Sequence, residues 1–251
     1  MSGGNPSERY ERQMKLAEVG PEGQRKLLAS SVLVVGAGGL GSPVLYYLAA
    51  AGVGRLGVAD PDTVAVTNLH RQILYGTPDV GKVKVEAAAA RLAALNPDVT
   101  VVRHPVRVDG ANIDELVRAY DLVVDAPDNF PTRYLVNDAC WRAGTPLVEA
   151  AVLGFSGMIM TIVPPKSPCY RCLHPIPPKE GTFPTPAEVG LMGMVPGVIG
   201  TLQAMEAVKV LLGIGSPLVG RVLFYDGLDA GFDEMRLERN PQCPLCGRPA
   251  G

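Results

Sequence analysis

The chain has 251 residues, of which 47% are hydrophobic and 19% are charged, and its formal net charge at pH 7 is −2. This length suffices for one large α/β domain or two small ones with a sizeable core. The small net charge argues against a nucleic-acid or acidic-lipid partner that is held by bulk charge.

Residues 27–54 carry no charge, as a membrane span would. Several glycines and Pro43 interrupt this segment, so we interpret it as a buried strand–turn–helix unit and expect no membrane association. The N-terminal MSGGNPSERYERQ has no apolar signal core, and we therefore expect a cytoplasmic protein.

Apolar runs along the chain predict alternating strands and helices. The expected elements are two short helices within 7–29, separated by Gly20-Pro21, then a strand over 31–36, a helix over 41–52, a strand over 55–60, a helix over 82–97, strands over 99–104 and 121–126, a helix over 132–144 and a strand over 146–152. This alternation is typical of an α/β fold with a Rossmann-like, mainly parallel sheet and helices on both faces.

The pattern changes after about residue 153. Residues 155–165 and 221–226 resemble strands without helices between them, which predicts that antiparallel strands extend the sheet. Residues 164–196 are rich in proline and glycine and form a long irregular segment of the kind that is usually functional or mobile. A late helix is expected over 197–213.

The sequence VVGAGGLGS lies between the first strand and the helix that follows it. Gly36, Gly38 and Gly41 have the G-x-G-x-x-G spacing, which allows a tight turn and close approach of a phosphate to the backbone amides at a helix N-terminus. Asp60, at the end of the next strand, is the expected ribose ligand. The motif predicts a nucleotide site and by itself fits NAD as well as ATP.

The residues after Asp60 favour ATP. Asn68, Arg71 and Gln72 approach the same end of the sheet, and Lys82 and Lys84 follow at the start of a helix. A triphosphate carries about four negative charges and requires cationic partners, whereas the two phosphates of NAD need little beyond backbone amides. Arg71 and one lysine fit that role, although Lys82 is equally well explained as a solvated surface charge.

Two further carboxylates lie at and just beyond the end of the fourth strand. Asp125 and Asp128 occupy the edge of the sheet at which ligands bind in open α/β folds. A carboxylate there can hold Mg²⁺ that bridges the ATP phosphates. Asp128 can alternatively cap the helix that begins near Asn129, and both roles are compatible.

Four of the five cysteines form two C-x-x-C pairs. Two such pairs, PCYRC and QCPLC, provide the four thiolates of a tetrahedral structural Zn²⁺ site, and these ligands are Cys169, Cys172, Cys243 and Cys246. Redox-active dithiols are the alternative, but neither pair is expected to open a helix directly after a strand. Cys140 lies on an expected helix and is interpreted as a core residue.

Taken in order, RYERQ, GAGGLGS, DPDTVAVTNLHRQ, GKVKVE, DAPDN, PCYRCL, GVIGTLQAMEAVK and NPQCPLCG resemble the ubiquitin-activating-like adenylyltransferases of bacteria, the MoeB/ThiF group. The resemblance covers residues 8–247. It implies an enzyme that activates the C-terminal Gly-Gly carboxylate of a ubiquitin-fold sulfur-carrier protein as an acyl-adenylate, with release of pyrophosphate from ATP. It also implies a single adenylation domain over 1–251, with N-terminal helices at 7–29, a nucleotide-binding half at 30–153 and an antiparallel half with the zinc site at 154–251.

The resemblance also implies roles for particular residues. Arg71, Lys84 and Asp128 would act in catalysis, with Asp128 holding Mg²⁺, and Arg12 would reach the phosphates from the other subunit of a homodimer. The implied nucleotide-binding residues are Gly36, Gly38, Gly39, Gly41, Asp60, Thr67, Asn68, Leu69, His70, Arg71, Lys84, Asp128 and Asn129. The four paired cysteines match the structural zinc of this group.

One feature departs from the group. Several of its members carry a cysteine in the irregular segment that links covalently to the carrier or its sulfur, whereas residues 173–194 contain none. We therefore predict an enzyme that stops at the acyl-adenylate, in agreement with the expected lack of a rhodanese-like extension.

Three other interpretations stay open from the sequence. The chain could be an NAD-dependent oxidoreductase, although no candidate hydride site is evident. It could activate a carboxylate on a modified tRNA base, which the small net charge disfavours. It could also be a scaffold that docks a ubiquitin-fold protein without catalysis.

Overall fold

The computed structural model describes residues 6–179, 182 and 186–247. Within these residues an eight-stranded sheet has the order β3-β2-β1-β4-β5-β6-β7-β8. The strands from β3 to β5 in this order pair in parallel, and β6, β7 and β8 are added antiparallel. The expected α/β class, with a Rossmann-like parallel sheet extended by antiparallel strands, is confirmed.

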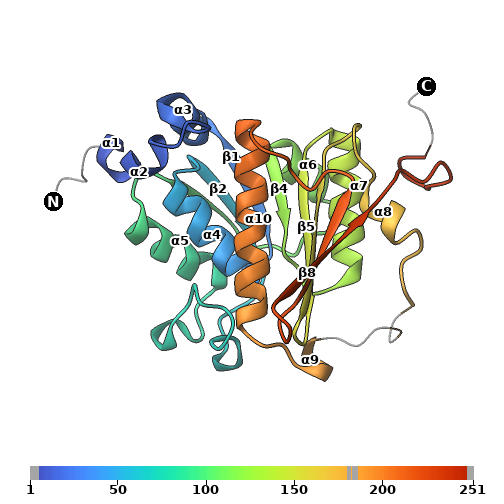
Figure 1. Ribbon diagram of the computed structural model, residues 1–251. Coiled ribbons are helices and arrows are strands. Elements are labelled where there is room, and N and C mark those ends of the chain that lie inside the picture. The colour runs from blue at the N-terminus through green and yellow to red at the C-terminus, as the bar shows by residue number, and fades with distance from the viewer. Residues whose placement is uncertain (1–5, 180–181, 183–185, 248–251) are drawn as a thin grey trace.

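The elements follow one another through the chain as shown in Figure 1. They are α1 (Pro6–Arg9), α2 (Glu11–Met14), α3 (Gly20–Ala29), β1 (Ser31–Val35), α4 (Gly41–Ala51), β2 (Arg55–Ala59), the 3₁₀ turns η1 (Val66–Asn68) and η2 (Thr77–Asp79), α5 (Lys84–Leu95), β3 (Thr100–His104), α6 (Ile113–Arg118), β4 (Leu122–Asp125), α7 (Phe130–Ala143), β5 (Leu147–Leu153), β6 (Ser156–Ile162), α8 (Tyr170–Leu173), α9 (Pro186–Val189), α10 (Met194–Leu212), β7 (Arg221–Asp226) and β8 (Gly231–Arg236).

Helices cover both faces of the sheet. Alternate residues of β1 point to opposite sides, so that Val32 and Val34 join one buried cluster and Leu33 and Val35 join the other. On the first face α10 packs against α4, β5 and β6, and α5 packs on β3; on the second face α7 packs against β4, β5 and α6 (Figure 1). Because all five residues of β1 are buried, this strand reads as a continuous apolar run.

Strands β1 and β4 are parallel neighbours in the sheet, and the side on which successive strands are added changes between them. From β1 the chain runs outward through β2 and β3, and from β4 it runs outward on the other side. Such a switch point leaves a crevice beyond the carboxyl ends of the two strands, where ligands bind in open α/β sheets. The glycine turn follows β1, and Asp128 follows β4.

The structure differs from the sequence expectation in several places. Gly20-Pro21 does not separate two helices but begins α3, with Pro21 in the first turn, and two shorter helices precede it. A proline is well tolerated there because the first amides of a helix have no intrahelical acceptor. The short α6 and the edge strand β8 were not expected, and α10 begins at Met194 inside the segment taken as irregular.

Among the described helices, α10 is the one that is long and apolar enough to cross a membrane by length and composition. Half of its 18-residue apolar stretch is buried inside the molecule, and the helix packs against α4, β5 and β6.

Candidate functional site

The glycine turn after β1 is closely packed against the segment after β4. Gly36 has a φ of +94°, and a Cβ on it would lie 2.6 Å from the carbonyl oxygen of Ala126. A Cβ on Gly41 would collide with the carbonyl oxygen of Gly36. Only glycine fits both positions, since one needs a left-handed backbone and the other a close backbone approach. The turn therefore begins α4 with its amides directed to the switch point.

Asp60 holds the glycine turn from the end of β2. Its Oδ2 accepts a hydrogen bond of 2.9 Å from the Ala37 amide, and its Oδ1 accepts one of 2.9 Å from the Asp62 amide. Lys84, which is 5% exposed at the start of α5, lies with its Nζ 3.6 Å from Asp60 Oδ2 and 3.0 Å from Asp62 Oδ2. The carboxylate and the ammonium thus stand together beside the turn. Lys82, in contrast, is exposed and pairs with Asp79 at 2.9 Å.

The segment 67–71 lies over the glycine turn together with the start of α10. A Cβ on Gly39 would lie 3.3 Å from Pro196 and 3.6 Å from Arg71 Cγ, so these three residues meet. Arg71 is partly exposed, and its Nη1 donates to the Thr67 carbonyl at 2.9 Å. The stem of the Arg71 side chain therefore lies against the glycine turn, so that its guanidinium could pair with a phosphate held by the amides.

The other members of this segment have distinct positions. Asn68 accepts a hydrogen bond of 3.0 Å from the Ala65 amide, and Leu69 packs against the buried cluster. Thr67 and His70 are exposed. Gly193 lies against the backbone of His70, so the end of the irregular segment rests on this strip.

Tyr75 and Gln72 lie beside the glycine turn. The Tyr75 hydroxyl, which is buried, donates to the Ala37 carbonyl at 2.9 Å. Burial, and then the charge of Asp60, raise the pKa of Tyr75, so this hydroxyl keeps its proton and acts as a donor. The Oε1 atom of Gln72 is buried without a hydrogen-bond partner among the described residues, and its Nε2 lies 3.6 Å from where a Gly38 Cβ would be. An unpartnered buried acceptor beside a glycine cradle fits a nucleotide site.

The two acidic residues after β4 are in opposite environments. Asp128 and Asn129 are exposed beyond the strand, and the Asn129 side chain caps α7 by accepting the Thr132 amide at 3.0 Å. Asp125 is fully buried and therefore cannot meet a solvated magnesium ion, which corrects the expectation that either carboxylate could do so. Asp128, free of the capping role, is the carboxylate that can hold such a cation.

Arg12 lies far from the glycine turn of its own chain. It is exposed on α2, and the adjacent Gln13 donates at 2.9 Å to the carbonyl of Ala51, at the last residue of α4. The glycine turn lies at the first residue of α4, about 16 Å away for a helix of 11 residues. The structure thus brings the other expected residues to one end of the sheet and leaves Arg12 at the other end of α4.

The four paired cysteines come together at the opposite side of the molecule. Their sulfur atoms all lie within 4.8 Å of one another, with 3.6 Å between Cys169 and Cys243 and 3.2 Å between Cys172 and Cys246. Four thiols at these separations are too far apart for disulfides and suit one tetrahedral metal ion. Burial raises the pKa of Cys169, and burial together with Cys172 raises that of Cys246 to about 12, so both thiols would release protons on binding a cation.

Two expectations about cysteines have clear outcomes. Cys169 directly precedes α8, but β6 ends at Ile162, seven residues earlier, so neither pair opens a helix directly after a strand, as expected. Cys140 is fully buried on α7, as expected of a core residue.

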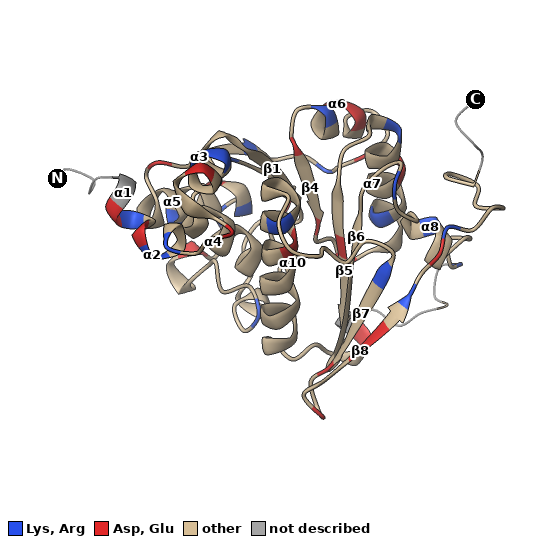
Figure 2. Cartoon of the chain, turned by 45° about the horizontal axis from the view of Figure 1, so that its top comes forward, with Lys and Arg blue, Asp and Glu red and all other residues tan. Residues whose placement is uncertain are grey.

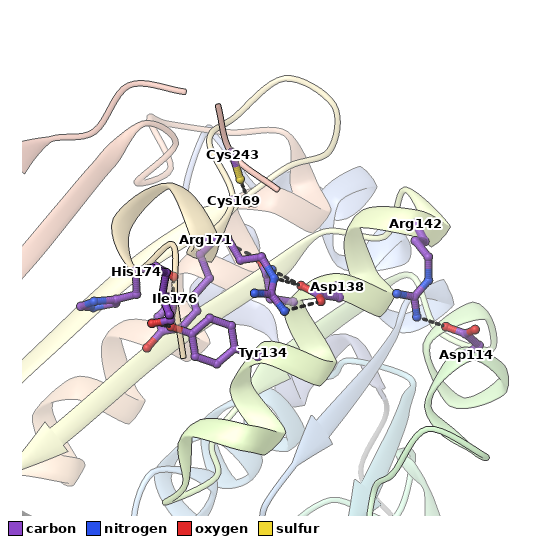
Figure 3. A network of polar contacts seen from close by, with 11 residues as sticks. Asp114, Tyr134, Asp138, Arg142, Cys169, Arg171, His174, Ile176 and Cys243 are labelled. Atoms are coloured by element: carbon purple, nitrogen blue, oxygen red, sulfur yellow. Dashed lines mark hydrogen bonds and ion pairs between the residues drawn. The ribbon is translucent and has the colours of Figure 1, made fainter. Parts of the chain in front are cut away.

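A polar network joins this cysteine knuckle to α7 (Figure 3). Arg171, between the first two cysteines, donates two hydrogen bonds of 2.8 Å to Asp138, and its guanidinium lies 4.7 Å from the Tyr134 ring centre. The Tyr134 hydroxyl lies 3.0 Å from the His174 carbonyl oxygen and 3.1 Å from that of Ile176. One helix therefore holds both the knuckle and the first residues of the irregular segment. Sequence reasoning missed this network because its members are scattered polar residues without a motif.

Comparisons with known proteins agree with this architecture. The model of the ThiF family matches residues 10–245. The chain is 56% identical to the sulfur carrier protein adenylyltransferase of Thermus thermophilus, covering 96% of this chain and 90% of that protein. It is 52% identical to the SAMP-activating enzyme E1 of Haloferax volcanii, covering 96% and 88% respectively. It is also 48% identical to the mouse adenylyltransferase and sulfurtransferase MOCS3, of which it spans 52%.

Solved structures resemble the fold over nearly the whole chain. The structure of E. coli MccB with ATP matches with a TM-score of 0.83 at 25% identity, covering 96% of this chain and 75% of that one. The structure of E. coli MccB with MccA-N7isoASN gives a TM-score of 0.85 at 25% identity, covering 98% of this chain and 76% of that one. With a family model that matches most of its length and close relatives of similar size, the chain belongs to the ThiF family.

Proposed function

We propose that this chain is an ATP-dependent adenylyltransferase that activates the C-terminal carboxylate of a small ubiquitin-fold sulfur-carrier protein as an acyl-adenylate and releases pyrophosphate. One structural observation carries the proposal: Arg71 and Lys84, which follow β2, and Asp128, which follows β4, come to the glycine turn after β1, the strand that lies between those two in the sheet. The relative at 56% identity, named a sulfur carrier protein adenylyltransferase, supports the same reaction.

The chemistry requires charge neutralisation more than proton transfer. The carrier's carboxylate is ionised at pH 7 and attacks the α-phosphate without a general base. Amides of the glycine turn and the Arg71 guanidinium would bind the phosphates, and Lys84 would add a second cation beside the Asp60 ribose ligand. The remaining expected nucleotide contacts, from Thr67 to His70 and at Asn129, line the same edge of the sheet. No hydride acceptor is needed, so the oxidoreductase alternative has no support from this arrangement.

Two metal ions belong to the proposal. Asp128 is the carboxylate that would hold Mg²⁺, which supplies positive charge to the triphosphate. The four cysteines would hold Zn²⁺, since four thiolates with no open position suit a structural zinc site. Their placement away from the glycine turn supports a structural role.

A homodimer is also part of the proposal. Arg12 cannot serve the nucleotide of its own chain from the far end of α4, but the same residue of a second copy could reach it. An exposed arginine on a short helix is suited to such a contact. We place the enzyme in the cytoplasm, as its soluble substrates require.

We further propose that the enzyme stops at the acyl-adenylate. Residues 173–194 contain no cysteine, and Cys140 is fully buried in the core. Burial raises the pKa of Cys140 well above its ordinary value, so the thiol is a poor nucleophile as well as an inaccessible one. Sulfur delivery then falls to another protein.

The test is exchange of labelled pyrophosphate into ATP. We expect exchange that needs Mg²⁺ and a sulfur-carrier protein ending in Gly-Gly, and none with the same carrier lacking its last two residues. Exchange that depends on tRNA instead would favour the nucleic-acid alternative. A wild-type chain that binds the carrier but exchanges no pyrophosphate would favour the scaffold alternative.

A further inference from the structure

Three charged side chains are buried behind the turn that carries Asp128. Asp125 on β4, Glu149 on β5 and Arg133 on α7 are 0%, 0% and 6% exposed. Asp125 and Glu149 are directly opposite each other in the parallel pair of strands, and they are the only acidic residues of the strands that carry them (Figure 2). Burying such groups is unfavourable unless they are paired, so this cluster is not explained by packing of the core alone.

The two carboxyl groups and the guanidinium form a neutral cluster when one of the carboxyl groups is protonated. Asp125 and Glu149 are register partners in the sheet, and both Asp125 oxygens and Glu149 Oε2 are buried without a hydrogen-bond partner among the described residues, so two ionised carboxylates here would repel each other. Burial, and then the neighbouring Glu149 charge, raise the pKa of Asp125 well above its ordinary value, so Asp125 keeps the proton. Arg133 forms an ion pair with Glu149, and the Glu149 charge raises the pKa of Arg133 against the effect of burial. The cluster as a whole is therefore neutral.

Arg133 uses its remaining donors on backbone carbonyls. One nitrogen, Nη1, donates to Ala150 on β5 as well as to Glu149, and Nη2 donates to the Pro127 carbonyl at 2.9 Å. Pro127 directly precedes Asp128, and the Gly36 turn lies against Ala126 on the other side. The guanidinium thus bridges β5 and the backbone from which Asp128 projects.

The segment 127–129 is consequently fixed at both ends. Arg133 holds the Pro127 carbonyl, and Asn129 is held by its capping contact with the Thr132 amide at 3.0 Å. Between them the Asp128 side chain is exposed and touches only Asn129 Nδ2, at 3.4 Å, among the hydrogen bonds of the described residues. The direction of Asp128 therefore depends on its backbone rather than on side-chain contacts.

We propose that Arg133 is a positioning residue that, through the Pro127 carbonyl, aims Asp128 at the site of the magnesium–triphosphate. The inference rests on the proposed function, in which Asp128 holds Mg²⁺. Arg133 itself touches neither nucleotide nor metal. The paired carboxylates keep the guanidinium charged and oriented inside the protein, without adding net charge behind the phosphate site.

The variant that isolates this role is Arg133→Lys. A lysine retains the positive charge beside Glu149, but one ammonium cannot span the carboxylate and two separate carbonyls as the planar guanidinium does. The matched control is Arg142→Lys on the same helix, where the exposed Arg142 pairs with Asp114 at 2.8 Å. Both variants are measured in the full chain by thermal unfolding and by ATP titration with Mg²⁺ and with EDTA.

We expect Arg133→Lys to bind ATP in EDTA within about twofold of wild type, and to lose about tenfold in ATP affinity when Mg²⁺ is present, because a misdirected Asp128 would hold the metal less well. A misplacement of about 1 Å can cost as much as about 10²-fold in rate where geometry is critical. Arg142→Lys should match wild type in both conditions. Equal behaviour of Arg133→Lys and wild type, or an equal loss with Mg²⁺ and with EDTA, would overturn the inference.

A second variant keeps the inference testable if Arg133→Lys does not fold. The double change Arg133→Met and Glu149→Gln removes the buried cation and anion together and leaves Asp125 neutral, so the fold should survive without the Pro127 contact. The same Mg²⁺-specific loss is expected, and its absence contradicts the inference. A wild-type chain that neither binds ATP nor exchanges pyrophosphate contradicts the proposed function instead.

Discussion

At the carboxyl end of β1 the site is shaped by the backbone, whereas the cysteine knuckle is shaped by side chains. Gly36 takes a φ of +94° and packs against Ala126, and the charged groups around that turn follow β2 and β4, the two neighbours of β1 in the sheet. At the knuckle, Cys169 and Cys243 are 74 residues apart in the chain and meet through their sulfur atoms.

This difference separates activity from stability. Arg71 and Asp128 are at least partly exposed, so removing them takes little buried contact away from the fold. The knuckle joins the C-terminal segment to α8 and α7, so its loss weakens the fold and leaves the glycine turn intact. Helix α7 contacts both regions, which makes it the element through which one can affect the other.

The largest expected effect is on activity at the glycine turn. Asp128→Asn should lower the rate of pyrophosphate exchange by about 10²- to 10³-fold, because it removes the carboxylate that would hold Mg²⁺, whose charge stabilises the reacting phosphates. Its melting temperature should stay within about 2 °C of wild type, since an exposed surface substitution changes stability by about 0.5 kcal/mol. A variant that keeps its activity, or loses it by unfolding, would break the separation.

The next effect is on stability at the knuckle. Cys246→Ser, or removal of the metal by a strong chelator, should lower the free energy of unfolding by about 3 kcal/mol, which corresponds to about 6–12 °C in melting temperature for a chain of this size. ATP affinity of the folded fraction at 15 °C should remain within about threefold of wild type, because no knuckle residue lies at the turn. Cys140→Ser provides a cysteine substitution outside the knuckle, and it should leave the metal content of the purified protein unchanged.

A smaller effect, that of Tyr134→Phe, tests how α7 holds the segment that follows the knuckle. Tyr134→Phe removes the hydroxyl that meets the His174 and Ile176 carbonyls, at a loss of about 1 kcal/mol. We expect faster hydrogen exchange at the amides of His174, Ile176 and Lys179, since the other residues of 174–179 are prolines without an amide hydrogen, and a rise of severalfold in the KM for the carrier, with ATP affinity unchanged. Arg142→Ala, on the same helix, should change neither quantity. Equal rises in the two KM values would show that the helix transmits its effect to both regions.

The smallest expected effect is that of substituting Lys82, and the neighbouring Lys84 provides the contrast. Lys82→Ala should alter pyrophosphate exchange by less than about twofold, because Lys82 is exposed and pairs with Asp79. Lys84→Ala should abolish most of the exchange, since Lys84 lies buried against Asp60 and Asp62. Steady-state assays of the two variants, made side by side, would detect any phosphate contact of Lys82 as a rise in the KM for ATP.

Motif and periodicity predicted the parts of this molecule that depend on local backbone rules. The glycine turn, the strands of the parallel sheet and the pairing of the cysteines all follow from patterns within short windows. The strand β8 was missed because five of its six residues are exposed and charged residues interrupt its pattern. The helix α6 was missed because six residues are too few for a periodic signal.

The candidate site was less predictable where it depends on tertiary contacts. Arg133 follows Asn129 by one helical turn and resembles an ordinary surface arginine in the sequence, yet it is buried behind Asp128. One signal was available: Glu149 interrupts the apolar run PLVEAAV, and a carboxylate in a strand with both faces covered requires a buried partner. The sequence carries no comparable signal that places Tyr75 and Pro196 beside the glycine turn, because each position depends on how distant segments pack.

The outermost strand has a consequence for solubility. Strand β8 lies at one edge of the eight-stranded sheet. The backbone amides and carbonyls on the outer side of an edge strand can pair with a strand of another chain. Asp233, Glu234 and Arg236 place charges along that edge (Figure 2). Another chain would have to remove water from these charged groups before it could pair with β8, which disfavours growth of the sheet at this edge.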